Sequence, residues 1–295
     1  MTKYTVIFNP LSNNSKGEES SRRLNDIMKG NELDFVNITQ IENYRSFFNS
    51  YPANSNFILA GGDGTINRFV NDCFDSGAVF PENLFYYPAG SGNDFFKDTG
   101  ADPNGFPIRL NPYIKDLPTV EVNGMRRKFI NGIGYGIDGY CCEEADRLRE
   151  ISNKPINYTS IAIKGLLYRF KPSDGTITVD GKKYRLKKIW LAPTMNGRYF
   201  GGGMMPAPSQ DRLNPERKLT LMSFYSSGKI RTLMRFPKIF TGEHVNFKKD
   251  CLVVEGYDIT VEYDRPCALQ IDGETVLNVK KCRCISSKLE SDAVK

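Results

Sequence analysis

The sequence is poor in histidine and has no long apolar segment. His244 is the single histidine among 295 residues, which argues against a histidine-based zinc site and against a Ser-His-Asp triad. No stretch comes near the roughly 20 apolar residues that a helix needs to cross a bilayer. The first apolar run, residues 4–8, is also too short for a signal peptide. We therefore expect a cytoplasmic protein, for which any contact with lipid takes place at a membrane surface.

Cysteine is present without a pairing pattern. The seven cysteines are odd in number and include no Cys-x-x-Cys pair, so we expect reduced structural thiols. A composition that is 40% hydrophobic and 25% charged is typical of a folded globular protein. The chain is about twice the usual domain length, which favours two domains with separate cores, although one large domain stays open.

The net charge of +6 is modest, but short basic runs recur along the chain. They lie at 126–128, 182–183, 187–188, 248–249 and 280–281. Two interpretations remain open: solvated lysines that discourage pairing of strand edges, or a face that is drawn to anionic lipid. Nucleic-acid binding is not expected, because no aromatic-interleaved motif or recognition helix accompanies the charge.

The first third of the chain alternates between strand and helix patterns. Strands are expected at Tyr4–Phe8, Asp34–Ile38, Phe57–Ala60 and Leu84–Tyr87, and helices at Lys16–Met28, Asn43–Asn49 and Thr65–Phe74. Such alternation predicts a three-layer α/β domain with a mainly parallel sheet. Ligands of such sheets sit at the carboxyl ends of the strands.

The pattern changes after a passage rich in proline and glycine from Asp102 to Pro118. Short alternating strands and turns such as Asp180-Gly181 predict a second, largely antiparallel domain. Helical stretches are expected near 140–151, 158–170 and 230–240. The expected organisation is an α/β domain over 1–118, a β domain over 119–287 and a loose polar tail over 288–295.

The most informative segment is Leu59-Ala60-Gly61-Gly62-Asp63-Gly64-Thr65-Ile66-Asn67, where an apolar strand runs into a glycine-rich turn and a helix begins near Thr65. Glycines let backbone N–H groups approach an anion, and a helix N-terminus adds a positive dipole end. Because a carboxylate does not bind phosphate directly, we interpret Asp63 as facing a Mg²⁺ ion that neutralises the phosphates. The alternative is a plain turn in which Asp63 caps the helix.

Two further loops follow predicted strands in the same way. Asn9-Pro10-Leu11-Ser12-Asn13-Asn14-Ser15-Lys16-Gly17 offers hydroxyl and amide groups for a nucleotide phosphate or ribose, although an Asn- and Ser-rich turn is often only a turn. Pro88-Ala89-Gly90-Ser91-Gly92-Asn93-Asp94-Phe95 places glycines beside an amide and a carboxylate. All three loops therefore suit phosphate binding.

Four motifs occur in a fixed order along the chain. Asn-Pro-x-Ser at 9–12, Gly-Gly-Asp-Gly-Thr at 61–65, Gly-Ser-Gly-Asn-Asp at 90–94 and Asp-Gly-Glu at 272–274 resemble the signature of bacterial diacylglycerol kinase-like lipid kinases. The resemblance covers nearly the whole chain. The second motif is shared with NAD kinases and 6-phosphofructokinase-like enzymes, whereas the third and fourth favour a lipid acceptor. The resemblance implies an α/β nucleotide-binding domain and an antiparallel β-sandwich domain, with the active site in the interdomain cleft.

By that similarity the protein is an ATP- and Mg²⁺-dependent lipid kinase, which phosphorylates a hydroxyl of diacylglycerol or a related lipid at the inner face of the membrane. Glu274 would be the base for the acceptor hydroxyl, with Asp272 and Asp63 as further catalytic residues. ATP would lie on residues of the three loops and on one threonine outside them: Asn9, Pro10, Ser12, Asn13, Thr39, Gly61, Gly62, Asp63, Gly64, Thr65, Asn67, Ser91, Asn93 and Asp94.

Elementary chemistry supports these roles without the resemblance. Phosphoryl transfer needs Mg²⁺ to spread charge and a carboxylate to orient or deprotonate the attacking alcohol. Asp272 and Glu274 are two residues apart, so on a hairpin they can share a side. The alternative for Asp272-Gly273 is an ordinary hairpin turn.

The chain departs from the resemblance at 210–219, which reads Gln-Asp-Arg-Leu-Asn-Pro-Glu-Arg-Lys-Leu. Many members carry Asp-Asp-Gly-x-Leu there, associated with a structural Mg²⁺, and only Asp211 and Glu216 could still help to hold it. An arginine-rich loop disfavours a cation. A further metal-site aspartate expected before the second domain is placed at Asp116, with Glu121 as an alternative. Residues 129–138 resemble the family's glycine-containing strand-to-helix passage, which packing alone would also explain.

Two other functions stay open. A soluble nucleotide kinase such as an NAD kinase is disfavoured by the motif at 90–94 and by the basic surface. A non-catalytic module that responds to ATP or lipid is disfavoured by the intact Asp-Gly-Glu, because binding alone needs no carboxylate to activate a hydroxyl. The residues do not predict which lipid is the acceptor, nor the oligomeric state, although a homodimer is common in such folds.

Overall fold

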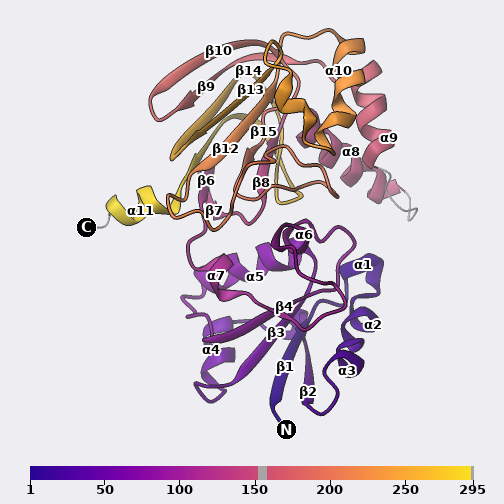
Figure 1. Ribbon diagram of the computed structural model, residues 1–295, viewed down its shortest axis with the longest axis vertical. Helices are drawn as coiled ribbons and strands as arrows, with labels where there is room; N and C mark the ends of the chain where they lie inside the picture. Colours follow the sequence, from indigo (N-terminus) through magenta and orange to yellow (C-terminus); the bar gives the residue numbers. More distant parts are fainter. Residues whose placement is uncertain (152–157, 294–295) are drawn as a thin grey trace. The chain divides into compact units, whose positions relative to one another are not determined.

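The computed structural model describes residues 1–151 and 158–293 (Figure 1). The chain divides into two compact units, Met1–Leu117 and Pro118–Lys295, called unit 1 and unit 2 below. Each unit has its own sheet and its own apolar core. An α/β unit is followed by an antiparallel one, as the change in sequence pattern predicts.

Unit 1 is built on a five-stranded sheet within residues 1–117. The strand order is β2-β1-β3-β4-β5, with β1–β4 parallel and β5 antiparallel at the edge. The strands are β1 (Lys3–Phe8), β2 (Glu32–Asn37), β3 (Asn56–Gly61), β4 (Asn83–Pro88) and β5 (Ile108–Arg109). Because parallel strands end at one edge, the residues after Phe8, Gly61 and Pro88 come together there.

Short helices connect the strands of unit 1. They are α1 (Ser12–Ser15), α2 (Gly17–Arg22), α3 (Leu24–Ile27), the 3₁₀ helix η1 (Ile38–Gln40), α4 (Tyr44–Asn49), α5 (Asp63–Asp75), α6 (Asp94–Thr99) and α7 (Asn111–Ile114). The single helix predicted over 16–28 is interrupted at Arg23. The helix predicted to start near Thr65 begins at Asp63 instead, so Thr65 lies inside its first turn.

The sheet of unit 1 is covered on both faces, which gives the predicted three layers. On one face Val6 and Ile58 pack with Leu24 and Met28, which come from α3 and the residue after it. On the other face aromatic rings of α4 and α5 meet β3, with Phe48 against Phe57 at a centroid distance of 5.2 Å. Adjacent strand residues point to opposite faces of the sheet, so Phe57 and Ile58 pack on opposite sides of it.

Unit 2 contains a ten-stranded antiparallel sheet within its described residues. The main path is β13-β12-β11-β8-β14-β15-β6-β7, and β9 joins β10 to β14. The strands are β6 (Thr119–Val122), β7 (Met125–Lys128), β8 (Gly132–Tyr135), β9 (Ser173–Val179), β10 (Lys182–Ile189), β11 (Thr194–Met195), β12 (Leu219–Phe224), β13 (Cys251–Gly256), β14 (Asp258–Ile271) and β15 (Glu274–Ile285).

The sheet of unit 2 folds over one apolar core. Strand β14 pairs with β9 over its first half and with β8 at its end. Residues of strands that lie far apart in the sheet, such as Val120, Ile177 and Leu221, join the same cluster. Inside it the rings of Tyr135 and Tyr263 stack at a centroid distance of 4.1 Å. The seven cysteines are all free thiols, as expected from their pattern.

Apart from the last one, the helices of unit 2 lie beside a second apolar cluster that includes Ile137, Leu166 and Trp190. They are α8 (Ile137–Ile151), α9 (Tyr158–Lys164), the π-helix η2 (Gly165–Arg169), α10 (Lys229–Arg235), the 3₁₀ helices η3 (Phe236–Ile239) and η4 (Glu243–Asn246), and α11 (Ser287–Ala293). In neither unit is a described helix both long and apolar enough to cross a membrane.

The prediction of a loose tail over 288–295 is wrong for residues 288–293, which belong to α11 (Ser287–Ala293). Glu290 of this helix bonds to Arg126 at 2.6 Å and to Lys128 at 2.7 Å. The sequence gives no sign of this helix because its stabilising partners lie about 160 residues earlier in the chain.

Candidate active site

Thr65 connects two of the predicted loops of unit 1. Its Oγ1 accepts a hydrogen bond from Asn9 Nδ2 at 2.9 Å and lies 3.1 Å from Ser12 Oγ. Thr65 is buried in the first turn of α5, at the carboxyl end of β3. The loop after β1 is therefore tied to the loop after β3.

Glycines bring the third loop against the same place. A Cβ atom on Gly90 would lie 2.3 Å from the Cα of Gly62, so the two backbones approach more closely than side chains allow. The Ala89 amide donates to the Gly61 carbonyl at 2.9 Å, which extends the β3–β4 pairing into the loops. Gly62 and Gly90 are thus required by close contact between two backbones, whereas a Cβ on Gly61 would lie 2.5 Å from the side chain of Thr65.

Asp63 bridges these two loops by its side chain. Its Oδ2 accepts the Asp94 amide at 2.9 Å and its Oδ1 accepts the Phe95 amide at 2.7 Å. These amides begin α6, so Asp63 caps a neighbouring helix and not its own. Neither of the two roles predicted for Asp63 includes this contact.

The other predicted nucleotide residues are divided between exposed and buried positions. Ser91 Oγ donates to Asn13 Oδ1 at 3.3 Å, which joins the first and third loops. Asn93, with a left-handed φ of 50°, closes its own loop by bonding to both backbone groups of Gly90. Thr39 follows β2 and bonds to Asn37 Oδ1 at 2.9 Å.

Among the rest, Pro10 lies at the turn after β1, Gly64 has open space where a Cβ would be, and Asn67 and Asp94 are buried.

In unit 2 the Asp272-Gly273 turn joins β14 to β15. Both residues have positive φ, 47° and 96°, which is typical of a two-residue hairpin turn. Asp272 Oδ2 accepts the Ile130 amide at 2.5 Å, and its Oδ1 accepts the amides of Asn131 and Gly132 at 2.8 and 2.9 Å. The carboxylate predicted to act in chemistry is thus bonded to three backbone amides, and Asp272 holds residues 130–132 beside the hairpin.

Glu274 is the first residue of β15 and its side chain is 52% exposed. Its Oε2 lies 3.8 Å from Nη1 of Arg127 in β7. The sequence analysis treated Arg127 only as part of a basic run at 126–128. No signal in the sequence connects Arg127 to Glu274, because β7 and β15 meet only through the folded sheet.

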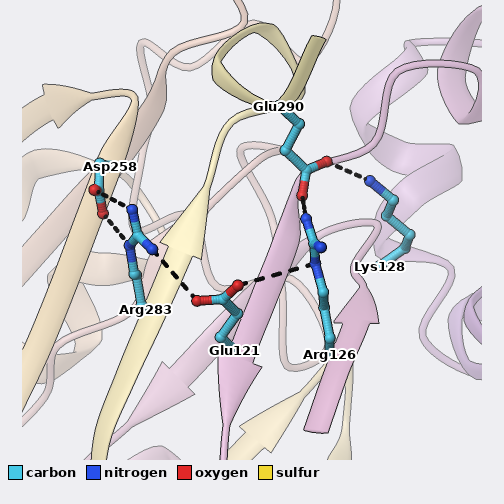
Figure 2. A network of polar contacts seen from close by, with 6 residues as sticks. All are labelled: Glu121, Arg126, Lys128, Asp258, Arg283 and Glu290. Carbon is cyan, nitrogen blue, oxygen red and sulfur yellow. Dashed lines mark hydrogen bonds and ion pairs between the residues drawn. The ribbon is translucent and has the colours of Figure 1, made fainter. Parts of the chain in front are cut away.

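The residues on either side of Arg127 are anchored to α11, as Figure 2 shows. Burial alone would raise the pKa of Glu290, but hydrogen bonds from Lys128, Thr119 and Arg126 outweigh it and hold that pKa below its usual value. The network continues on the neighbouring strands through three more side chains: Glu121, Arg283 and Asp258. It fixes β7 and thereby the backbone that carries Arg127.

Asp138 is a buried carboxyl group behind the hairpin. Gln270 donates to its Oδ2 at 2.8 Å, and Gln270 Oε1 accepts the Gly273 amide at 2.5 Å. A Cβ on Gly134 would lie 1.4 Å from Asp138 Oδ2, so only glycine admits the carboxyl group there. Burial raises the pKa of Asp138 to about 7, against the lowering effect of the Gln270 bond. In the sequence, this passage resembles a family motif and can also be explained by packing, but no pattern there connects it to the turn.

The predicted metal ligands do not gather into a cluster. Asp116 forms an ion pair with Lys115 at 3.8 Å, and Asp211 Oδ1 accepts the Leu213 amide at 2.9 Å. Within residues 1–151 and 158–293, no group of three or more His, Cys, Asp or Glu residues could hold a metal ion. Any cation at Asp63 would therefore need ligands from a bound molecule or from water.

Comparisons with known proteins match each of the two units to a known domain. Residues 3–110 match the model of the diacylglycerol kinase catalytic domain, and residues 131–286 match the YegS C-terminal NAD kinase beta sandwich-like domain. The chain is 25% identical over 255 residues to a diacylglycerol kinase of Mycobacterium tuberculosis (strain CDC 1551 / Oshkosh), an alignment that covers 82% of this chain and 80% of the relative. It is 28% identical over 188 residues, 55% of each chain, to a Bacillus subtilis (strain 168) protein named "Putative lipid kinase YtlR".

A solved structure shares the fold. A crystal structure titled as a diacylglycerol kinase from Bacillus anthracis str. Sterne superposes with a TM-score of 0.58 at 15% identity, over 96% of this chain and 93% of that one. The two matched domain models cover β1–β5 of the first sheet and β8–β15 of the second, and leave β6 and β7 between them. The chain therefore belongs to the diacylglycerol kinase family of lipid kinases, in which a diacylglycerol kinase catalytic domain precedes a YegS-type C-terminal domain.

Proposed function

We propose that this kinase uses ATP and Mg²⁺ to phosphorylate a hydroxyl group of diacylglycerol or a related lipid at a membrane surface. The observation that carries the proposal is the meeting of three glycine-containing loops around Thr65 and Asp63 in unit 1. Close backbone packing of this kind leaves amides free of Cβ atoms, which suits the phosphates of a nucleotide.

The helix α5 adds to the anion site. It spans Asp63–Asp75, with Gly62 as its N-cap, and so presents the positive end of its dipole next to the glycines. Asn9, Ser12 and Thr65 offer polar groups in the same place. We therefore assign the nucleotide phosphates to Gly61–Thr65, with Ser91 and Asn13 at the border of the site.

Asp63 fits a Mg²⁺ ion that is also held by phosphate oxygens. Mg²⁺ in kinases is bound by one or two carboxylates together with phosphates and water, so a protein cage of several acids is not needed. When bound, the ion would neutralise phosphate charge during the transfer. Asp63 would hold it while the amides of Asp94 and Phe95 keep the carboxylate oriented.

Glu274 is the proposed base for the lipid hydroxyl. It is exposed enough to reach a substrate, and its position is fixed by the Asp272 turn and by the 3.8 Å contact with Arg127. A carboxylate that accepts the proton of the attacking alcohol contributes typically 100- to 10,000-fold to a rate.

Helix α10 of unit 2 supports action at a membrane surface. Ile230 and Met234 are 72% and 67% exposed and, being four residues apart, share one face of the helix. Lys229 and Arg231 lie beside them, and the single carboxylate of Asp250 pairs with both Arg231 and Arg235. Exposed apolar side chains among excess positive charge suit the surface of an anionic bilayer.

A phosphotransfer assay tests the function. Purified protein is incubated with labelled ATP and a panel of lipids in mixed micelles, and with NAD in the absence of detergent. We expect Mg²⁺-dependent labelling of a lipid, and a loss of at least about 100-fold in Glu274→Gln with unchanged folding. Glu255→Gln, an exposed glutamate on β13, is the matched control. Labelling of NAD alone, or full activity in Glu274→Gln, would contradict the proposal.

A further inference from the structure

Arg212 is a buried arginine for which the proposed reaction gives no role. Only 6% of its surface is exposed. Its Nη2 donates to Asn131 Oδ1 at 3.0 Å, and its Nη1 donates to the Ile130 carbonyl at 3.4 Å. Removing a guanidinium group from water is costly unless its N–H groups are bonded, so this burial indicates a fixed task in the fold.

The same residues are held from another side by the Glu274 hairpin. Asp272 accepts the amides of 130–132, and its own amide donates to the Gly132 carbonyl at 3.1 Å. Asn196 completes the set, because its Nδ2 donates to the Ile130 carbonyl at 2.8 Å and its amide to the Asn131 carbonyl at 2.8 Å. The position of residues 130–132 therefore determines where Asp272, and with it Glu274, can lie.

The loop that carries Arg212 does not have the ligands of the structural Mg²⁺ site that the family resemblance implies. Asp211 is bonded to the Leu213 amide, whereas Glu216 Oε2 accepts from Tyr257 at 2.6 Å and from Lys288 at 2.7 Å. The two carboxylates thus serve different partners. Mg²⁺ requires several oxygen ligands in near-octahedral geometry, and a buried guanidinium beside them would repel it. These residues do not fit the ion.

We infer that Arg212 takes the place of a bound cation in this chain and is a positioning residue for Glu274. Its N–H groups are directed at a backbone carbonyl and an amide oxygen, which are oxygen types that also coordinate hard metal ions. Unlike a bound ion, the arginine charge is covalently attached and is not removed by a chelator. Unit 2 therefore holds residues 130–132, and through them the hairpin, without a divalent ion.

Thermal unfolding of the full chain without substrate tests the independence from metal. Trp190, the one tryptophan of the sequence, is buried in unit 2, so its fluorescence reports on that unit. We expect the midpoint to differ by less than about 1 °C between excess EDTA and millimolar Mg²⁺. A rise of more than about 4 °C with Mg²⁺ would overturn the inference.

Two variants test the role of Arg212 itself. Arg212→Met keeps the length and removes the charge, and Arg212→Lys keeps the charge but loses the planar fork that reaches two acceptors. We expect both to lower the Trp190 midpoint, Met more than Lys. If Mg²⁺ raises the unfolding midpoint of Arg212→Met but not that of the natural chain, the result supports the inference that Arg212 replaces a cation. The control is Arg185→Lys, at an exposed arginine bonded to Asp264. This variant should change neither the unfolding midpoint nor its response to Mg²⁺.

The positioning role is measured by kinetics and rests on the proposed function. We expect Arg212→Lys to lower kcat about tenfold with an unchanged KM for ATP, because the nucleotide residues belong to unit 1. A higher KM for ATP at constant kcat, or no change in either, would refute the positioning role even if stability falls. If the natural chain labels no lipid, the proposed function fails, and the unfolding experiments still decide whether Arg212 replaces a cation.

Discussion

The two units each use an aspartate from a glycine-containing turn to hold backbone, but they do so for different ends. In unit 1 Asp63 binds the first amides of α6, between loops that pack glycine against glycine. In unit 2 Asp272 binds the amides of 130–132, and Arg212 holds the same residues by their oxygens. In the proposed function, unit 1 brings backbone amides close to the nucleotide, whereas unit 2 positions the side chain of Glu274.

This difference shows why an aspartate in such a turn is ambiguous in sequence. Carboxylate oxygens that accept amides are the same atoms that coordinate Mg²⁺. The two aspartates differ in their surroundings: α5 begins at Asp63 beside the proposed anion site, whereas Asp272 lies in a hairpin turn and accepts three backbone amides. The predictions below test that separation.

The largest effects are expected from replacing the two aspartates by asparagine. Asp63→Asn should lower kcat/KM on the order of 100-fold, because the proposed ion loses its charged ligand. It removes one of the two amide bonds at α6 in unit 1 and should leave the unfolding of unit 2 unchanged. Asp272→Asn should destabilise unit 2 by about 3 kcal/mol, because an amide cannot accept three N–H groups as a carboxylate does. Kinetics and urea unfolding monitored by Trp190 separate the two. If activity were lost only in Asp272→Asn, then Asp272 and not Asp63 would be the aspartate that serves the reaction.

The next effect is a pH dependence of unit 2 that unit 1 should not share. The pKa of Asp138 is raised by burial to about 7 from an ordinary value of 3.8, so the folded state binds the proton more tightly than the unfolded state. The contribution of Asp138 to stability should therefore fall as pH rises toward 7 and be level above it, by about 2 to 3 kcal/mol between pH 5 and 8. Burial lowers the pKa of His244 in the same unit, which acts in the opposite direction, so the Asp138 effect is the difference between the natural chain and Asp138→Asn. Asp138→Asn should remove this decline. Urea unfolding monitored by Trp190 at several pH values checks it, with the exposed Asp264→Asn as control.

Two glycines of unit 1 should respond in opposite directions. Gly90→Ala places a Cβ 2.3 Å from the Cα of Gly62 and should destabilise unit 1 by about 2 kcal/mol. Gly64→Ala meets nothing within 4 Å and lies in the first turn of α5, so it should stabilise by about 0.5 kcal/mol while raising KM for ATP. Hydrogen exchange of unit 1 and ATP titration measure both. If Gly90→Ala and Gly64→Ala change the stability of unit 1 equally, close backbone contact is not the reason for glycine at position 90.

The smallest effect concerns the surface of unit 2. Ile230→Ser should weaken binding to phosphatidylcholine vesicles that contain anionic phosphatidylglycerol by about 1 kcal/mol, because an exposed apolar side chain is lost. Val79→Ser, an equally exposed site in unit 1, is the control. Vesicle sedimentation measures binding, and phosphorylation of a soluble short-chain acceptor should be unchanged. Equal loss in both variants would contradict a specific role for α10.

Local patterns were enough for much of the fold. The strand and helix alternation in the first third predicts the parallel sheet, and all four predicted strands lie within β1–β4 to within one residue. The motifs at 9–12, 61–65 and 90–94 predict loops at the carboxyl ends of β1, β3 and β4, where the structure brings them together. These features follow from short-range periodicity and from the geometry of parallel strands.

The sequence by itself thus determined the two-part fold, the free thiols and the position of the three loops at the ends of their strands, because each depends on neighbouring residues. Only the tertiary structure decided that Asp63 caps α6, that Arg127 faces Glu274, that Arg212 is buried against Asn131, and that residues 287–293 form a helix. Each of the last three contacts joins residues about 80 to 160 positions apart. Their energies appear only when distant strands pair, and no local pattern encodes them.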